Sequence, residues 1–205
     1  PWNKLHYHRY NANYEFLINI CRFILRGFLL ASDKGQYKMA SFLDDQEMSA
    51  LYEKFVLEYF RYHHPDLGPA ASRVPWNVEG EESDLLPVMQ TDVTLRHGGN
   101  TLIIDTKYYS RMTRERFDRR TFHSENLYQI FTYVKNQDKL GLGNVAGMLL
   151  YARTDEAFIP DCAFTIGGNK ITVKTLDLSL EFKHIAAQLD GIAESVRRSS
   201  LAGNP

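Results

Sequence analysis

The stretch TDVTLRHGGNTLIIDTK, residues 91–107, decides the fold expected for this chain of 205 residues. Its first part alternates between apolar and polar residues, as a strand buried on one face does. Gly98 and Gly99 follow and can adopt the positive φ angles of a tight reversal. The second part is apolar until Asp105, which is typical of a buried central strand that ends in charge. We therefore expect a β-hairpin with charged residues at its open end.

Two carboxylates and a lysine are placed together by this hairpin. Asp105 and Lys107 are two residues apart on one strand and share a face. Pairing across the glycine turn brings Asp92 beside Asp105. Two acids at one point repel each other unless a cation lies between them, and hard oxygen ligands favour magnesium or manganese. A metal site is one interpretation, and an exposed strand end with solvated charges is the other.

A helix is expected to begin near Ser124, a suitable N-cap residue, and to continue through Val134. Four apolar residues at helical spacing form its buried stripe. Gln129 and Tyr133 lie four residues apart on a neighbouring face, so their polar ends can reach one site together.

This ordered set, an Asp, then Asp-x-Lys, then Gln-x-x-x-Tyr, resembles the PD-(D/E)xK nuclease superfamily in its RecB-like branch. More narrowly, LPVMQTD (86–92), IIDTKYY (103–109) and NLYQI (126–130) resemble the McrC family. These are nuclease subunits of McrBC restriction systems, which act on modified cytosine such as 5-methylcytosine. The resemblance covers residues 45–153 well and the first forty residues more loosely. It implies an α/β fold with a restriction-endonuclease-like core, in which helices flank a mixed β-sheet.

The resemblance also implies a metal centre. Asp92, Asp105 and the main-chain carbonyl of Thr106 would hold Mg²⁺, with Mn²⁺ as an alternative. In the superfamily, the first core helix often carries a glutamate that reaches the metal, and Glu53 is the matching position. A salt bridge to Lys54 or a solvated side chain is the other interpretation of Glu53.

Lys107 would orient the attacking water or stabilise the charge that develops on phosphorus. Gln129 and Tyr133 would hold the site or the strand backbone. The chain departs from the family pattern at two positions, because Thr91-Asp92 replaces Pro-Asp and Asp105 replaces Glu. These departures leave one-metal and two-metal chemistry equally open.

Five arginines lie within the ten residues 111–120, between the lysine and the helix, although the net charge of the chain is only −1. Guanidinium groups bind phosphate oxygens well, so we expect this predicted loop to contact the DNA backbone. A solvated loop that pairs with the acids at 115 and 118 is the alternative. The predicted DNA-binding residues are Arg111, Arg114, Arg116, Arg119 and Arg120.

Three segments are expected: an N-terminal helical arm (1–40), a nuclease domain (41–198) and a flexible tail (199–205). Residues 14–31 of the arm are apolar, but Arg22 and Arg26 interrupt them, so an amphipathic helix is favoured over a membrane span. Within the domain we expect a helix from 41 to 63, then strands at 73–78, 145–151, 158–164 and 170–175. A closing helix is expected at 181–198.

Cys21 and Cys162 match no metal-binding spacing and suggest no disulfide scaffold, which favours a reducing cytosol. The resemblance implies double-stranded DNA as substrate and a separate AAA+ GTPase motor (McrB-like) as partner, and no phosphate-binding loop motif occurs in the sequence. Three alternatives remain open. They are a RecB-like exonuclease or recombination nuclease that needs no GTPase, a non-catalytic adaptor that docks on a motor, and a generic DNA-binding module.

Overall fold

A five-stranded mixed sheet forms the centre of the protein, with the strand order β3-β4-β7-β9-β8. The computed structural model describes residues 41–80, 85–108, 113–116, 119–153 and 159–201. The predicted N-terminal arm lies outside these residues. The described helices are α2 (Ser41–His63), η2 (Pro65–Leu67), α3 (Ser124–Gln137) and α4 (Phe182–Leu201).

The predicted hairpin is confirmed. Strands β3 (Val93–His97) and β4 (Asn100–Lys107) pair antiparallel, with Val93 opposite Ile104. Gly98 and Gly99 have φ angles of 54° and 81°, which side chains other than glycine rarely adopt. Strand β3 begins at Val93, immediately after Asp92. On the side of β4 that faces β3, strand pairing therefore ends just before Asp105. The open end of the hairpin is therefore also the border of the sheet.

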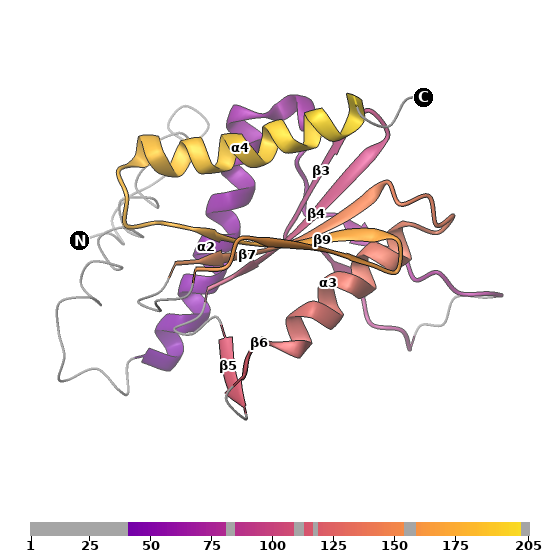
Figure 1. The fold of residues 1–205 in the computed structure, drawn as a ribbon, viewed down its shortest axis with the longest axis horizontal. Helices are drawn as coiled ribbons and strands as arrows, with labels where there is room; N and C mark the ends of the chain where they lie inside the picture. Colours follow the sequence, from indigo (N-terminus) through magenta and orange to yellow (C-terminus); the bar gives the residue numbers. More distant parts are fainter. Residues whose placement is uncertain (1–40, 81–84, 109–112, 117–118, 154–158, 202–205) are drawn as a thin grey trace.

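Strands β7 (Val145–Ala152) and β9 (Asn169–Leu176) lie parallel to β4, whereas β8 (Cys162–Ile166) pairs antiparallel with β9. Parallel neighbours need a crossover connection, and α3 lies on the path from β4 to β7. Figure 1 shows α3 on one side of the sheet and α4 on the other. The expected mixed α/β architecture is thus present.

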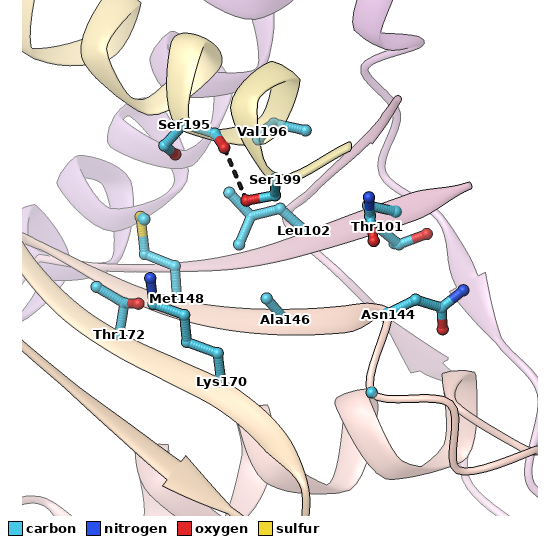
Figure 2. A pocket seen from close by; sticks show the side chains of 12 residues that line it. Thr101, Leu102, Asn144, Ala146, Met148, Lys170, Thr172, Ser195, Val196 and Ser199 are labelled. Carbon is cyan, nitrogen blue, oxygen red and sulfur yellow. Dashed lines mark hydrogen bonds between the residues drawn. The ribbon is translucent and has the colours of Figure 1, made fainter. Parts of the chain in front are cut away.

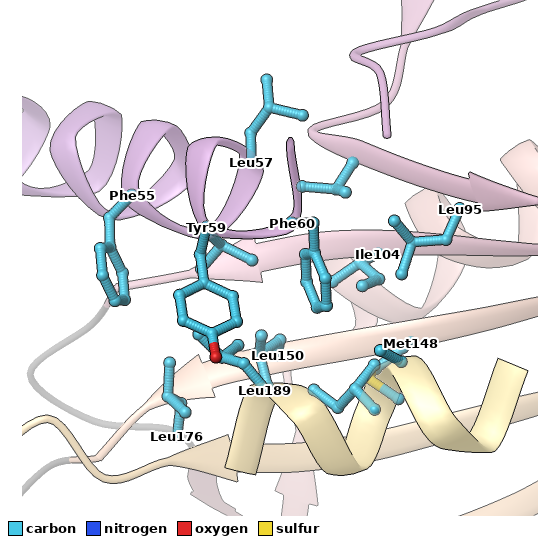
Figure 3. Close-up of a cluster of buried hydrophobic side chains, with 14 of the residues drawn as sticks. Phe55, Leu57, Tyr59, Phe60, Leu95, Ile104, Met148, Leu150, Leu176 and Leu189 are labelled. Carbon is cyan, nitrogen blue, oxygen red and sulfur yellow. The ribbon is translucent and has the colours of Figure 1, made fainter. Parts of the chain in front are cut away.

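The two faces of the sheet carry separate apolar clusters. Helices α2 and α4 pack on one face against alternate residues of the central strands, among them Ile104 and Leu150 (Figure 3). Helix α3 packs on the other face, where Ile103 and Leu149 point. Asp105 and Lys107 share the alternation of Ile103, so they belong to the face that α3 covers. This is why residues of α3 can reach the end of β4.

Helix α3 lies very close to β7 at Gly147. A Cβ atom there would lie 2.7 Å from Ile130 Cγ1 and 2.9 Å from Val134 Cγ2, both on α3. These distances are shorter than carbon atoms tolerate, so only glycine allows this approach. Gly147 therefore sets the spacing between the helix and the sheet.

Several predicted boundaries were wrong. The strand expected at 73–78 is only β1 (Arg73–Val74), which pairs with β2 (Met89–Gln90) in a sheet of two strands, and Pro75 ends it. The strand expected at 158–164 starts at Cys162. Helix α4 runs to Leu201, three residues beyond the end predicted at 198. Residues 202–205 lie outside the described part.

The arginine-rich segment is also not a plain loop. Strands β5 (Thr113–Arg116) and β6 (Arg119–Phe122) form an antiparallel hairpin just before α3 (Figure 1). Among the residues described, no helix is long and apolar enough to cross a membrane. The predicted amphipathic helix at 14–31 lies outside the described residues.

Candidate functional site

Asp105 is the buried acid of the candidate site. Its side chain is 1% exposed at the C-terminal end of β4. Lys107 Nζ lies 2.8 Å from Asp105 Oδ2 as an ion pair. Neither carboxylate oxygen accepts a well-directed hydrogen bond from any described residue. Buried polar atoms are almost always satisfied, so it is unusual that Oδ1 of this buried acid has no hydrogen-bond partner among the described residues and that Oδ2 has the ammonium group of Lys107 beside it.

Burial raises the pKa of Asp105 from 3.8 to about 7. The charge of Lys107 opposes this increase, and the charges of Asp92 and Glu53 add to it. The lysine therefore does not compensate for the loss of hydration and the nearby negative charge. A further positive charge beside Asp105 would stabilise the ionised carboxylate.

Asp92 lies where the hairpin prediction placed it, beside the end of β4. Its Oδ2 accepts two hydrogen bonds from Thr106, one from the main-chain N–H and one from the hydroxyl Oγ1, each 2.7 Å long. In a strand, the N–H and C=O of one residue point to the same side. The carbonyl of Thr106 therefore also points toward the border of the sheet where Asp92 lies. The family resemblance implied a role for this carbonyl, but it implied none for the hydroxyl.

Gln129 and Tyr133 on α3 are joined to Lys107 by a chain of hydrogen bonds. Lys107 Nζ donates to Gln129 Oε1 at 3.0 Å, and Gln129 Nε2 donates to the Tyr133 hydroxyl at 3.0 Å. The expectation that these two helical residues reach the strand end together agrees with this geometry. These hydrogen bonds, together with the ion pair, hold the lysine between helix α3 and Asp105.

A second pair of residues lies beside the lysine and was not singled out from the sequence. Asn126 Nδ2 donates to the Tyr151 hydroxyl at 3.0 Å, and both side chains are buried. Tyr151 is the register partner of Lys107 on β7. Asn126 lies three residues before Gln129 on α3, and this spacing is the signal that could have revealed it.

Glu53 on α2 is in electrostatic contact with the site. Burial raises its pKa, the charge of Asp92 raises it further, and Lys107 lowers it. In the described part of the chain, no three His, Cys, Asp or Glu side chains are close enough to hold a metal ion. The role of Glu53 as a metal ligand stays a prediction.

The predicted DNA-binding arginines fall mostly on the small hairpin. Arg114 and Arg116 belong to β5, and Arg119 and Arg120 belong to β6. Arg116 is the register partner of Arg119. Arg111 lies outside the described residues. Their role in DNA binding stays a prediction.

A hollow of about 250 Å³ lies at the other end of the sheet (Figure 2). It is lined by the first residues of β4 and β9 and by the end of α4, including Thr101, Lys170 and Ser195. None of the predicted site residues lines it. The candidate site is therefore defined by the C-terminal end of β4 and not by this hollow.

The fold and the site together define a mixed α/β protein with two acids and a lysine at the end of a central strand. Comparison with known families specifies this class further. The chain belongs to the family described as "McrBC 5-methylcytosine restriction system component", whose profile matches residues 1–152. The matched range includes every acid, the lysine and both α3 residues of the candidate site.

A curated relative supports the same assignment. The chain is 32% identical over 180 residues to the type IV methyl-directed restriction enzyme EcoKMcrBC of Escherichia coli strain K12. The aligned region covers 86% of this chain and 51% of the relative. The chain thus spans about half the length of that protein.

Proposed function

We propose that this chain is the metal-dependent DNA endonuclease component of a restriction system directed at modified cytosine. The observation that carries the proposal is the state of Asp105. It is a buried acid whose Oδ2 lies 2.8 Å from Lys107 Nζ and whose Oδ1 has no hydrogen-bond partner among the described residues, with Asp92 across the hairpin. This arrangement agrees with the PD-(D/E)xK pattern, in which two acids hold a metal and a lysine lies next to it.

The donor set fits Mg²⁺, and Mn²⁺ as an alternative. Asp92, Asp105 and the Thr106 carbonyl offer only oxygen atoms, which are the preferred ligands of these hard cations. A divalent ion at this position would oppose the effects of burial and of the neighbouring negative charges, which raise the pKa of Asp105. When bound, Mg²⁺ would supply the Lewis acidity that lowers the barrier to phosphodiester hydrolysis.

The protein's own groups would do the rest of the chemistry. Lys107 would place its ammonium group beside the phosphate and stabilise the negative charge that grows on it. Gln129 accepts a hydrogen bond from Lys107, and Tyr133 accepts one from Gln129. These contacts would keep the ammonium group aimed at one position without reorganisation during the reaction.

Family membership supports a proposal for the substrate and the partner. The E. coli relative is named a methyl-directed restriction enzyme, and the family a 5-methylcytosine system. Double-stranded DNA with modified cytosine is therefore the proposed substrate. A GTP-hydrolysing motor of the AAA+ class, carried on a separate chain, is the proposed partner. Because the proposed substrate is DNA inside the cell, we propose that this chain acts in the cytosol.

The test is nicking of methylated and unmethylated plasmid by this chain, with and without the motor subunit and GTP. We expect cleavage only of methylated plasmid, and only with the motor, GTP and Mg²⁺ present. Cleavage without GTP would favour an autonomous RecB-like nuclease. No cleavage by the complete system, together with intact docking on the motor, would favour an adaptor and overturn the proposal.

A further inference from the structure

Thr106 contacts Asp92 through its side chain as well as its main chain, although the family pattern uses only the main chain at this position. Both hydrogen bonds from Thr106 end on the same atom, Asp92 Oδ2, and both are 2.7 Å long. Hydrogen bonds to a carboxylate are short and strong, so two of them hold this oxygen in place. They also occupy Oδ2 and leave Oδ1 as the oxygen available to a ligand.

The N–H bond follows from the fold, whereas the hydroxyl bond depends on the residue type. Any residue except proline at position 106 would present an N–H where the partner strand ends, because β3 begins at Val93. Only serine or threonine adds a hydroxyl with this reach. Thr106 is also only 9% exposed, so water has little access to replace its hydroxyl.

We propose that Thr106 is a positioning residue that makes Asp92 a single-oxygen ligand. Its hydroxyl holds Oδ2 away from the metal and aims Oδ1 at the space beside Asp105. This inference rests on the proposed metal site. It adds a side-chain role to a position where the family pattern uses only the main-chain carbonyl.

The experiment measures Mn²⁺ binding to the 205-residue chain by electron paramagnetic resonance, without DNA or motor. The variants are Thr106→Val, which keeps the shape but removes the hydroxyl, and Thr106→Ser, which keeps the hydroxyl. Thr172→Val is the matched control, because Thr172 is also a strand residue with 9% exposure. Asp105→Asn reports on the metal site itself, and thermal melting checks that each variant is folded.

We expect Thr106→Val to weaken Mn²⁺ binding about tenfold or more, as loss of a group that orients a ligand does. Thr106→Ser and Thr172→Val should bind as the parent does. In cleavage assays, Thr106→Val should need more Mn²⁺ but approach the parent rate at saturation. A purely structural role would lower the melting temperature of Thr106→Val without weakening its Mn²⁺ binding.

Two failures can be told apart. If the parent binds Mn²⁺ no better than Asp105→Asn does, the proposed metal site is wrong. If the parent binds Mn²⁺ and folded Thr106→Val binds it equally well, only the role of the hydroxyl is wrong. Equal weakening by Val and Ser would also overturn that role, because the hydroxyl would then make no difference.

Discussion

Asp105→Asn should separate the chemistry of the candidate site from its stability. The change keeps the size of the side chain and removes its negative charge. We expect cleavage to be lost, because Asp105 is a proposed metal ligand, while the fold is retained. The same substitution should change how stability depends on pH, and this effect can be calculated from the buried position of the carboxyl group.

The sign of the pH effect follows from the pKa. The unfolded chain loses this proton near pH 3.8, whereas the folded protein holds it to about pH 7. Between these values the folded protein binds more protons than the unfolded chain, so its stability falls as pH rises. Above about pH 7 the carboxyl group is ionised in both the folded and the unfolded chain. The loss of folding stability caused by ionising the buried Asp105 then no longer increases. Between pH 5 and pH 8 it grows by about 2.5 kcal/mol, at roughly 1.4 kcal/mol per pKa unit.

Asp105→Asn removes this loss of stability. Its free energy of unfolding, relative to the parent, should therefore rise by about 2.5 kcal/mol between pH 5 and pH 8 without metal. For a chain of this size, that equals roughly 5–10 °C in melting temperature. Thermal melts at several pH values measure the difference directly. Mg²⁺ at pH 8 should stabilise the parent but not the variant, because a ligand that binds only the folded state raises its stability.

Asp161→Asn provides a matched control, because Asp161 is exposed and pairs with Lys174 at the surface. The stability of Asp161→Asn should depend on pH in the same way as that of the parent. A constant stability difference between Asp105→Asn and the parent across pH would show that Asp105 does not hold a proton near neutrality. Normal cleavage by folded Asp105→Asn would place the metal site elsewhere.

Three other substitutions should fail in different ways. Lys107→Ala should slow single-turnover cleavage by about a hundredfold, because charge stabilisation in the transition state is lost. Mn²⁺ binding and DNA binding should be retained. Cleavage at the parent rate would contradict this role of Lys107. Neutralising Arg111, Arg114 and Arg116 should weaken DNA binding and flatten its salt dependence, with cleavage restored at high DNA concentration; an unchanged salt slope in binding titrations would exclude phosphate contact. Gly147→Ala should lower the free energy of unfolding by about 1–3 kcal/mol in denaturant melts, because the added methyl group overlaps α3. Unchanged stability would show that α3 can move away from β7.

The local patterns of the sequence determined the hairpin and the main members of the candidate site. Alternation in β3 and the glycine pair fixed the register, and the register brought Asp92 beside Asp105. Helical spacing alone put Gln129 and Tyr133 on one face of α3. These predictions succeeded because each depends on residues close in the chain, where side-chain direction follows from backbone periodicity.

The arginine-rich segment shows where local patterns fail. Residues 113–116 are all polar, so no alternation of apolar and polar residues indicates a strand. The segment nevertheless pairs with 119–122 as a hairpin. Strand formation there depends on pairing between two short segments, and composition does not report that pairing.

Tertiary structure alone decided the properties that depend on distant segments. The placement of β7 beside β4 joins residues more than forty positions apart, and it brings Tyr151 next to Lys107. The raised pKa of Asp105 results from burial under α3 and the surrounding strands, and the same sequence in an extended chain would titrate normally. The Thr106 hydroxyl gained its partner only because the sheet ends at Val93. Sequence therefore determined which chemical groups are available. Packing determined which of them are buried away from water and which are in contact with one another.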